Sequence, residues 1–241
     1  MTGARPVRSP GWRLDEVTSA GRENLDARHV ALYDEKEDAG AGAEVALLIG
    51  LGLARDAHVV DLGAGTGQFT LAVAAHCARV VAVDVSPVML RRLRAKVTAS
   101  GQTNIEVVDS GFLTYQHEGQ PADVVYSRWA LHHLPDFWKA VALHRMRGIL
   151  RPGGILRLCD VVYSFDPSDA EVRLEDWCST APVEAASASS WVRADLEEHV
   201  RDEHSTFTWL LEPMIERSGF RIDHATHTPD GIFAEYVARA V

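Results

Sequence analysis

The chain has 241 residues, a formal net charge of −10 and 46% hydrophobic residues, enough for one α/β domain with a complete core. Nucleic-acid-binding proteins normally carry a basic field, so this charge disfavours DNA or RNA as a substrate. The only cysteines, Cys77, Cys159 and Cys178, form no CxxC pair, which argues against disulfide and zinc frameworks. There is no signal-peptide pattern and no apolar run of membrane-spanning length, so we expect a cytoplasmic protein without a membrane partner.

The N-terminal part of the chain divides into three segments. Residues 1–20 lack periodicity and predict a flexible tail, and residues 21–241 are expected to form a single domain. Apolar residues from Arg22 to Asp38 recur with helical spacing, and a second, almost wholly apolar helix is expected from Ala43 to Leu53.

A β-branched run followed by three closely spaced glycines comes next. His58–Asp61 predicts a buried strand that ends in an acid, and Gly63, Gly65 and Gly67 alternate with small residues before a new helical pattern. Glycine suits a turn with positive φ or a backbone that a ligand approaches closely. The spacing is Gly-x-Gly-x-Gly, which is neither the dinucleotide fingerprint nor a phosphate-binding P-loop. A tight strand–helix turn with no ligand is the structural alternative.

Strands and helices then alternate. Further strands are expected at 79–85, 105–109, 122–127 and 155–163, with helices at 87–100 and 136–150 between them. Ser86 and Pro87 have the arrangement of an N-cap followed by proline at the first helical position. This alternation predicts an α/β fold with a parallel sheet. After residue 165 we expect a helical insertion over about 166–205, a helix at 207–218, and strands at 220–226 and 232–238.

In this order, the segments VDLGAGTG, VAVDVS, VVDSGF, ADVVYS and LRPGGIL resemble the class I S-adenosylmethionine-dependent methyltransferases. The resemblance implies a Rossmann-like, doubly wound, mostly parallel seven-stranded sheet with an antiparallel last strand. The insertion at 166–205 would be a small helical lid. The His-His-Leu tripeptide after the fourth strand resembles the ubiquinone/menaquinone-biosynthesis branch of small-molecule enzymes.

The resemblance also implies which residues hold S-adenosyl-L-methionine. Asp61 would orient the glycine turn and the methionine amino group, Asp84 would accept both ribose hydroxyls, and Asp109 would accept from the adenine amine. The full predicted cofactor set is Asp61, Gly63, Ala64, Gly65, Gly67, Asp84, Val85, Asp109, Ser110, Gly111, Phe112, Ser127, Arg128 and Trp129. Each acid also has a structural alternative, such as capping a turn or facing solvent.

Candidate catalytic residues are His133 and His132, since a histidine there could orient or deprotonate a nucleophile. Their alternative is a structural hydrogen bond at the start of the next helix. With no third ligand cluster evident, we expect no metal site. Tyr33 is expected to close the sulfonium pocket and Trp191 to line the substrate pocket.

The sequence therefore predicts methyl transfer from S-adenosylmethionine to a small-molecule O, N or C nucleophile by in-line displacement. The chain is expected to act as a monomer or homodimer and to bind no nucleic acid. Two alternatives stay open: a catalytically silent S-adenosylmethionine-binding protein, and a nicotinamide-dependent oxidoreductase, which the glycine spacing disfavours. Methylation of a protein or tRNA is disfavoured by the net charge and by the missing loop motif.

Overall fold

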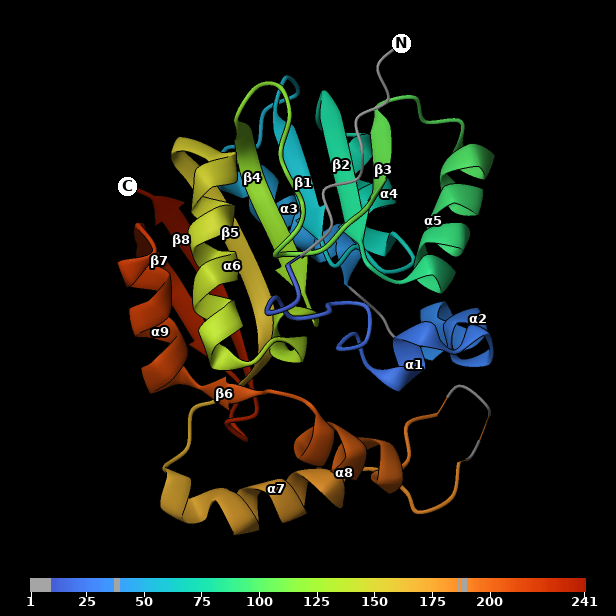
Figure 1. The fold of residues 1–241 in the computed structure, drawn as a ribbon, viewed down its shortest axis with the longest axis vertical. Helices are drawn as coiled ribbons and strands as arrows, with labels where there is room; N and C mark the ends of the chain where they lie inside the picture. Colours follow the sequence, from blue (N-terminus) through green and yellow to red (C-terminus); the bar gives the residue numbers. More distant parts are fainter. Residues whose placement is uncertain (1–9, 37–39, 186, 188–189) are drawn as a thin grey trace.

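The structure, a computed structural model, describes residues 10–36, 40–185, 187 and 190–241 and contains one mixed sheet (Figure 1). The sheet has the strand order β3-β2-β1-β4-β5-β8-β7, and β6 pairs with β5 outside this path. Strands β1 to β5 are parallel, and β8 is antiparallel to both of its neighbours. The bounds are β1 His58–Leu62, β2 Arg79–Asp84, β3 Ile105–Asp109, β4 Ala122–Arg128, β5 Leu150–Tyr163, β6 Thr206–Phe207, β7 Phe220–His227 and β8 Phe233–Ala240.

The predicted fold class is confirmed by this topology, and the sheet has one strand more than the seven predicted. The additional strand, β6, is only two residues long and pairs with the end of β5 at Val162 and Tyr163. So short a strand carries no alternating pattern from which a sequence could predict it.

Helices cover both faces of the sheet. Helices α6 (Asp136–Ile149) and α9 (Thr208–Arg217) pack on one face through Leu143, Met146 and Ile215. On the other face, α3 (Ala41–Gly50) and α4 (Gln68–Ala74) contribute Leu48 and Val73 to a second apolar cluster (Figure 1). The central strands are therefore buried from both sides, which explains their continuous Val/Ile runs.

Two helix ends show how local sequence sets the elements. Helix α5 (Pro87–Ser100) begins where the Ser86 hydroxyl accepts the backbone N–H of Met89 at 3.2 Å, as the N-cap pattern predicted. The single helix predicted from Arg22 to Asp38 is instead two, α1 (Arg22–Leu25) and α2 (Ala27–Lys36). Asp26 separates them, since its carboxylate accepts the N–H of Arg28 at 2.7 Å.

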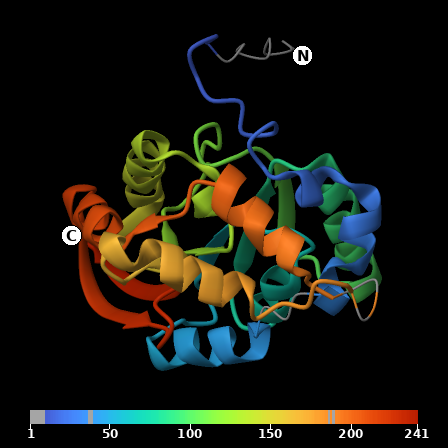
Figure 2. The ribbon, with the colours of Figure 1, turned by 90° about the horizontal axis from the view of Figure 1, so that it is seen from below.

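Two further helices lie beyond the carboxyl ends of the parallel strands. Helices α7 (Ala170–Cys178) and α8 (Arg193–Asp202) follow the short η2 turn (Pro167–Asp169) and pack on each other. They lie across the same end of the molecule as α1 and α2 (Figures 1 and 2). We call α7, α8 and their connections, residues 166–205, the cap. This is the segment in which the sequence predicted a lid.

The segment predicted as a flexible tail lies partly outside the described residues. Its described part, from Pro10 to Ala20, packs on the body, and Glu16 is buried. A carboxylate that accepts hydrogen bonds from a distant loop holds this segment, and no local periodicity announces such a contact. No helix among the described residues is long and apolar enough to cross a membrane.

Candidate functional site

The glycine turn after β1 is shaped by two different constraints. Gly63 has a φ of +76°, and a Cβ added there would overlap the side chain of Ala130. Gly65 has a φ of +53°, but a Cβ there would meet no atom within 4 Å. The Gly65 N–H donates to the Asp84 carboxylate at 2.8 Å. Gly63 thus fits the packing of the fold, whereas Gly65 leaves an open face that a ligand can approach.

This difference predicts a separation of effects. Gly63→Ala should lower the melting temperature by several degrees, because it combines a strained φ with a steric overlap. Gly65→Ala should lower it less, because only the φ penalty applies, yet it should weaken cofactor binding at least tenfold. Thermal melts and calorimetric titration with S-adenosylhomocysteine measure both. Equal loss of affinity and stability in the two variants would contradict this assignment.

Asp84 stands at the carboxyl end of β2, beside the turn. One carboxylate oxygen accepts the N–H of Ser86 at 2.7 Å and the other accepts that of Gly65 at 2.8 Å. Burial raises the pKa of Asp84, while these two hydrogen bonds act in the opposite direction. Each carboxylate oxygen has a further lone pair, so the group can still accept two hydroxyls of a ribose.

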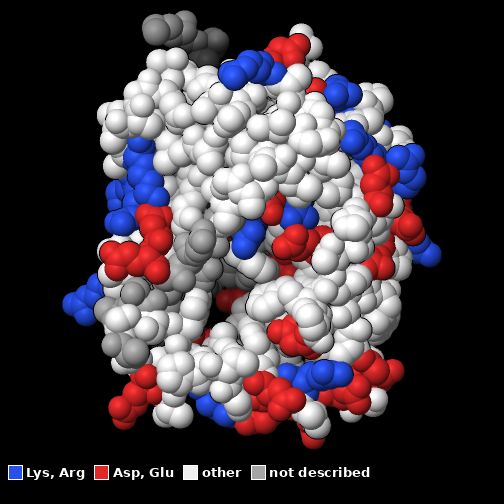
Figure 3. Space-filling model, turned by 180° about the vertical axis from the view of Figure 1, so that it is seen from behind, with Lys and Arg blue, Asp and Glu red and all other residues white. Residues whose placement is uncertain are grey.

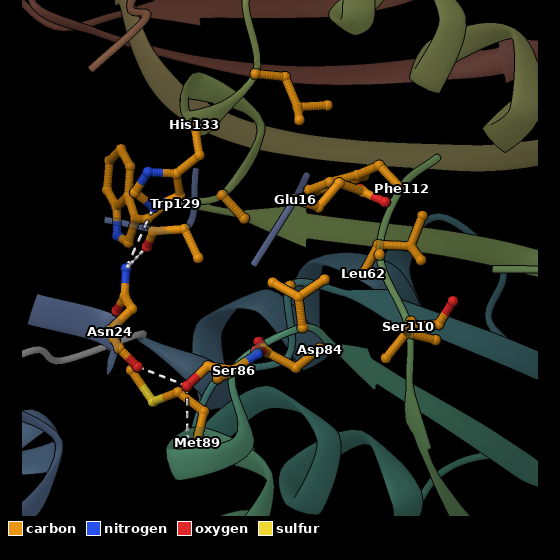
Figure 4. Close-up of a pocket in the computed structure, with 18 of the residues that line it drawn as sticks. Glu16, Asn24, Leu62, Asp84, Ser86, Met89, Ser110, Phe112, Trp129 and His133 are labelled. Atoms are coloured by element: carbon orange, nitrogen blue, oxygen red, sulfur yellow. Dashed lines mark hydrogen bonds between the residues drawn. The ribbon is translucent and has the colours of Figure 1, made fainter. Parts of the chain in front are cut away.

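A crevice runs along this end of the sheet (Figure 4). Asp84 and Ser86 lie between its two ends, with Ser110 and Phe112 at one end and Trp129 and His133 at the other. Eleven of the predicted residues line it: Tyr33, Gly63, Gly65, Asp84, Val85, Ser110, Gly111, Phe112, Arg128, Trp129 and His133. Segments far apart in sequence therefore meet in one groove.

A smaller hollow continues from the crevice past the glycine turn and holds two more predicted residues, Asp61 and Ala64. Asp61 is fully enclosed and accepts the Thr70 hydroxyl at 2.5 Å. Burial and the nearby charge of Asp84, opposed by the Thr70 hydrogen bond, together raise the pKa of Asp61 to about 7. A cationic amino group bound in this hollow would favour the ionised form of Asp61.

Three residues of the predicted cofactor set line neither the crevice nor this hollow. Gly67 packs on the helix after β2, where a Cβ would overlap Leu93. Asp109 is exposed at the end of β3. Ser127 is buried, and its hydroxyl has no hydrogen-bond partner among the described residues. Their predicted roles in cofactor binding stay predictions.

A larger cavity of about 510 Å³ lies between the crevice and the cap. Figure 3 shows the molecule hollowed on this side. Aromatic side chains from the sheet and the cap line the cavity together with histidines and acids: Trp129, Trp177, Trp191, Phe233, His29, His132, His133, His199, Asp195, Glu198 and Glu203. Its volume falls within the range of about 300–1,000 Å³ that is typical of small-molecule sites. The predicted residues Trp191 and His132 belong to it.

Four residues line both the crevice and the cavity: Asn24, Tyr33, Trp129 and His133. Trp129 has a φ of +50°, the one positive φ among the described non-glycine residues. A bulky residue in this conformation is strained, and such strain is concentrated at functional sites. The Arg128 guanidinium lies 4.9 Å from the centre of the Trp129 ring, and Phe233 packs edge-on against it. These contacts fix the Trp129 ring at the junction of the crevice and the cavity.

His132 is fixed between two carboxylates. Its Nδ1 is bonded to Asp160, which is 2% exposed, and its Nε2 lies 3.0 Å from Glu203. His199 Nδ1 lies 2.5 Å from the same Glu203 oxygen. Burial alone would lower the pKa of His132, but the attraction of Asp160 and the hydrogen bonds to both acids raise it to about 10. A charged ring with both nitrogens engaged fits the structural alternative for His132.

His133 lies beside it in a different state. Burial and the neighbouring positive charge of His132 lower the pKa of His133 to about 3, so its imidazole is neutral at pH 7. The Nε2 atom lies 3.3 Å from the Asn24 amide nitrogen, and Nδ1 has no hydrogen-bond partner among the described residues. Donor atoms of His132, His133 and Glu203 lie within 4.8 Å of one another.

Sequence reasoning missed several residues of this site. Asp160 lies within a predicted strand, whereas Glu203, the second carboxylate on His132, lies in the cap. Glu16 enters the crevice from the expected tail, and Asp34 of α2 accepts the Thr66 hydroxyl of the glycine turn. Each of these contacts joins segments more than 25 residues apart, so no local pattern predicts it.

The residues of the crevice fit the adenosyl ligand that the resemblance implies. The open face at Gly65 and the remaining lone pairs of Asp84 suit a ribose. The enclosed Asp61 suits an ammonium group, and the apolar side chains of Val85 and Phe112 suit a flat base. In such a fit the sulfur lies toward the shared residues Trp129 and His133.

Comparisons with known proteins concern the family of the chain. Residues 59–154 match a family described as "Methyltransferase domain". A carboxy-S-adenosyl-L-methionine synthase of Photorhabdus laumondii is 30% identical over 68% of this chain and 64% of its own length. A trans-aconitate 2-methyltransferase of Methylobacterium radiotolerans is 34% identical over 52% of this chain and 46% of its own length. The chain thus spans less than two thirds of these two relatives.

A solved structure extends the likeness to the fold. An S-adenosylmethionine-dependent methyltransferase of Mesorhizobium loti superposes with a TM-score of 0.59 and 21% sequence identity, over 83% of this chain and 98% of that one. At this identity the likeness concerns the fold alone. The family match and the curated relatives identify the chain as a member of the class I S-adenosylmethionine-dependent methyltransferases, whose cofactor is S-adenosylmethionine.

Proposed function

We propose that this protein transfers the methyl group of S-adenosylmethionine to a small molecule bound in the cavity under the cap. The observation that carries the proposal is the set of residues shared by crevice and cavity: Asn24, Tyr33, Trp129 and His133. A sulfonium methyl bound beside them would face the cavity directly. The relative that methylates trans-aconitate supports an acceptor of small size.

The chain's own residues would supply position and water exclusion. S-adenosylmethionine, when bound, brings a methyl group on an excellent leaving group, so the protein mainly has to hold a nucleophile in line with it. Tyr33 and Trp129 would close the junction around the methyl group. His133 lines both spaces, and because its imidazole is neutral at pH 7 it can accept a hydrogen bond from the nucleophile and orient it.

The lining of the cavity favours a particular shape of substrate. Indole rings of Trp177 and Trp191 and the ring of Phe233 offer stacking surfaces to a flat or unsaturated body. Glu203 and His133 lie on the polar side of the cavity, near the junction. We therefore propose an acceptor with an apolar, flat body and one polar group at the reacting end.

The test is product formation. The full chain is incubated with S-adenosylmethionine carrying a labelled methyl group and a set of small-molecule extracts, and labelled products are identified by mass spectrometry. The proposal expects a labelled small molecule and stoichiometric S-adenosylhomocysteine. Tight binding of S-adenosylhomocysteine without any transfer would support the silent binding protein instead, and stabilisation by NADH alone would support the oxidoreductase.

Two variants separate the proposed roles once a substrate is known. His133→Ala should lower kcat by roughly tenfold, because the nucleophile loses the hydrogen bond that orients it, with cofactor affinity unchanged. Trp191→Ala should raise KM for the acceptor and leave affinity for the cofactor intact. His29→Ala is the matched control for His133, because His29 lines the same cavity but not the crevice. A loss of cofactor affinity in both variants would indicate a folding role.

A further inference from the structure

A buried carboxylate from the N-terminal segment enters the cofactor crevice. Glu16 is 8% exposed and lines the crevice. One of its oxygens accepts the backbone N–H of Leu113 at 3.0 Å, and the other accepts the Thr114 hydroxyl at 3.1 Å. Figure 4 shows Glu16 beside Phe112, within the groove. The carboxylate is thus anchored at the crevice wall, although its segment lies about a hundred residues away in sequence.

This end of the crevice is the one that suits a base. Asp84 marks the ribose position, and Trp129 and His133 mark the opening to the substrate cavity, where the sulfur belongs. The end that remains is formed by Ser110 and Phe112, with Val85 next to Asp84. Adenine, a flat and largely apolar ring, is therefore the part of the adenosyl group that would bind at this end.

The loop after β3 leaves room for the carboxylate. A Cβ added to Gly111 would overlap the carboxyl group of Glu16. Gly111 does not have a positive φ, so its backbone conformation is open to other residues. Glycine at position 111 therefore leaves free the space that the Glu16 carboxyl group occupies.

Hydrogen-bond chemistry identifies what Glu16 would recognise. An ionised carboxylate only accepts hydrogen bonds, and each of its oxygens has more than one lone pair. Among the edge groups of adenine in an adenosyl ligand, the 6-amino group is the polar N–H donor, while the ring nitrogens N1, N3 and N7 accept. Asp109, the acid expected to read this amine, is exposed and does not line the crevice.

We propose that Glu16 accepts a hydrogen bond from the 6-amino group of the cofactor and makes the site specific for adenine. Glu16 is then a specificity-determining residue supplied by the N-terminal segment. The inference rests on the proposed placement of the cofactor in the crevice, with the ribose at Asp84.

The test compares two ligands that differ only by the 6-amino group. One is S-adenosylhomocysteine, and the other is its 6-deamino analogue, in which unsubstituted purine replaces adenine. Calorimetric titration of the full chain should give the adenosyl compound a preference of roughly 10–100-fold, because the analogue lacks the donor of the charge-assisted hydrogen bond. In Glu16→Gln a neutral amide replaces the charged acceptor, so the preference should fall severalfold.

Two further variants show whether the preference depends on the position of the Glu16 carboxylate. Gly111→Ala, which displaces the Glu16 carboxyl without changing its chemistry, should also reduce the preference, whereas Asp109→Asn should retain it. An unchanged preference in Glu16→Gln, or its loss in Asp109→Asn, would overturn the proposal, as would tighter binding of both ligands on removal of Glu16. Asp84→Ala tests the cofactor placement separately, because it should weaken both ligands by the same factor. Melting curves without ligand identify any variant that has lost its fold.

Discussion

Replacing Asp84 by alanine is expected to weaken binding of S-adenosylhomocysteine by at least about 100-fold. Two ribose hydroxyls would each lose a hydrogen bond to a charged acceptor, and such bonds contribute about 1.5–3 kcal/mol each. The variant also removes the acceptor that holds the N–H groups of Gly65 and Ser86, so the glycine turn loses its anchor. Isothermal titration calorimetry of the purified full chain measures the change.

The control for this variant is an acid on the neighbouring strand. Glu106 of β3 is exposed and pairs with Arg79, away from the crevice, so Glu106→Gln should leave the affinity unchanged. Asp84→Asn keeps the shape but loses the charge and should fall between the wild type and Asp84→Ala. Undiminished affinity in Asp84→Ala would remove the ribose assignment.

The largest effect on stability is expected at His132. His132→Ala leaves the buried carboxylate of Asp160 without its partner, and removal of one member of a buried ion pair costs about 3–5 kcal/mol. For a chain of this length, that corresponds to a fall in melting temperature of roughly 6–20 °C. His144→Ala, at an exposed position of α6, is the control and should change the melting temperature little.

The double variant His132→Ala/Asp160→Ala tests whether the effect belongs to the pair. Because it removes both charges, it should be less destabilised than the sum of the single variants. Strict additivity would mean that the two side chains do not interact in the way the distances indicate. Denaturant unfolding of all four proteins gives the coupling free energy.

The same pair gives the stability a predictable pH dependence. The pKa of His132 is raised to about 10 in the folded chain, above the value of about 6.5 expected when unfolded. Its stabilisation is therefore complete below pH 6.5 and is lost between pH 6.5 and 10, by up to about 1.4 kcal/mol per pH unit. On the acid side the pKa values of Asp160 and Glu203 are lowered, so their contribution is lost as the pH falls. His132→Ala should lack the alkaline slope.

Much of the fold could be predicted from local patterns in the sequence. The strand Ile105–Asp109 has its predicted bounds, and the strand predicted over His58–Asp61 extends to Leu62, because continuous β-branched runs between helices have few alternatives in an α/β domain. The helix Pro87–Ser100 also has its predicted bounds, because Ser86 and Gly101 define its ends chemically. The glycine turn and the acid at the end of β2 were predictable for the same reason: both are tied to strand ends.

The rest of the site depends on tertiary proximity. Glu203 meets His132 only because the cap returns across the carboxyl end of the sheet, and Glu16 meets Leu113 only because the N-terminal segment packs there. Neither residue belongs to a periodic pattern or a motif. For Asp109, the position in the sequence suits a role in adenine binding, but the side chain is exposed in the structure.

The most direct test is a crystal structure of the full chain with S-adenosylhomocysteine. It is expected to show both ribose hydroxyls on Asp84 and the sulfur at the junction of Trp129 and His133, directed into the cavity under the cap. A ligand whose ribose lies away from Asp84, or whose sulfur faces solvent instead of that cavity, would contradict the account.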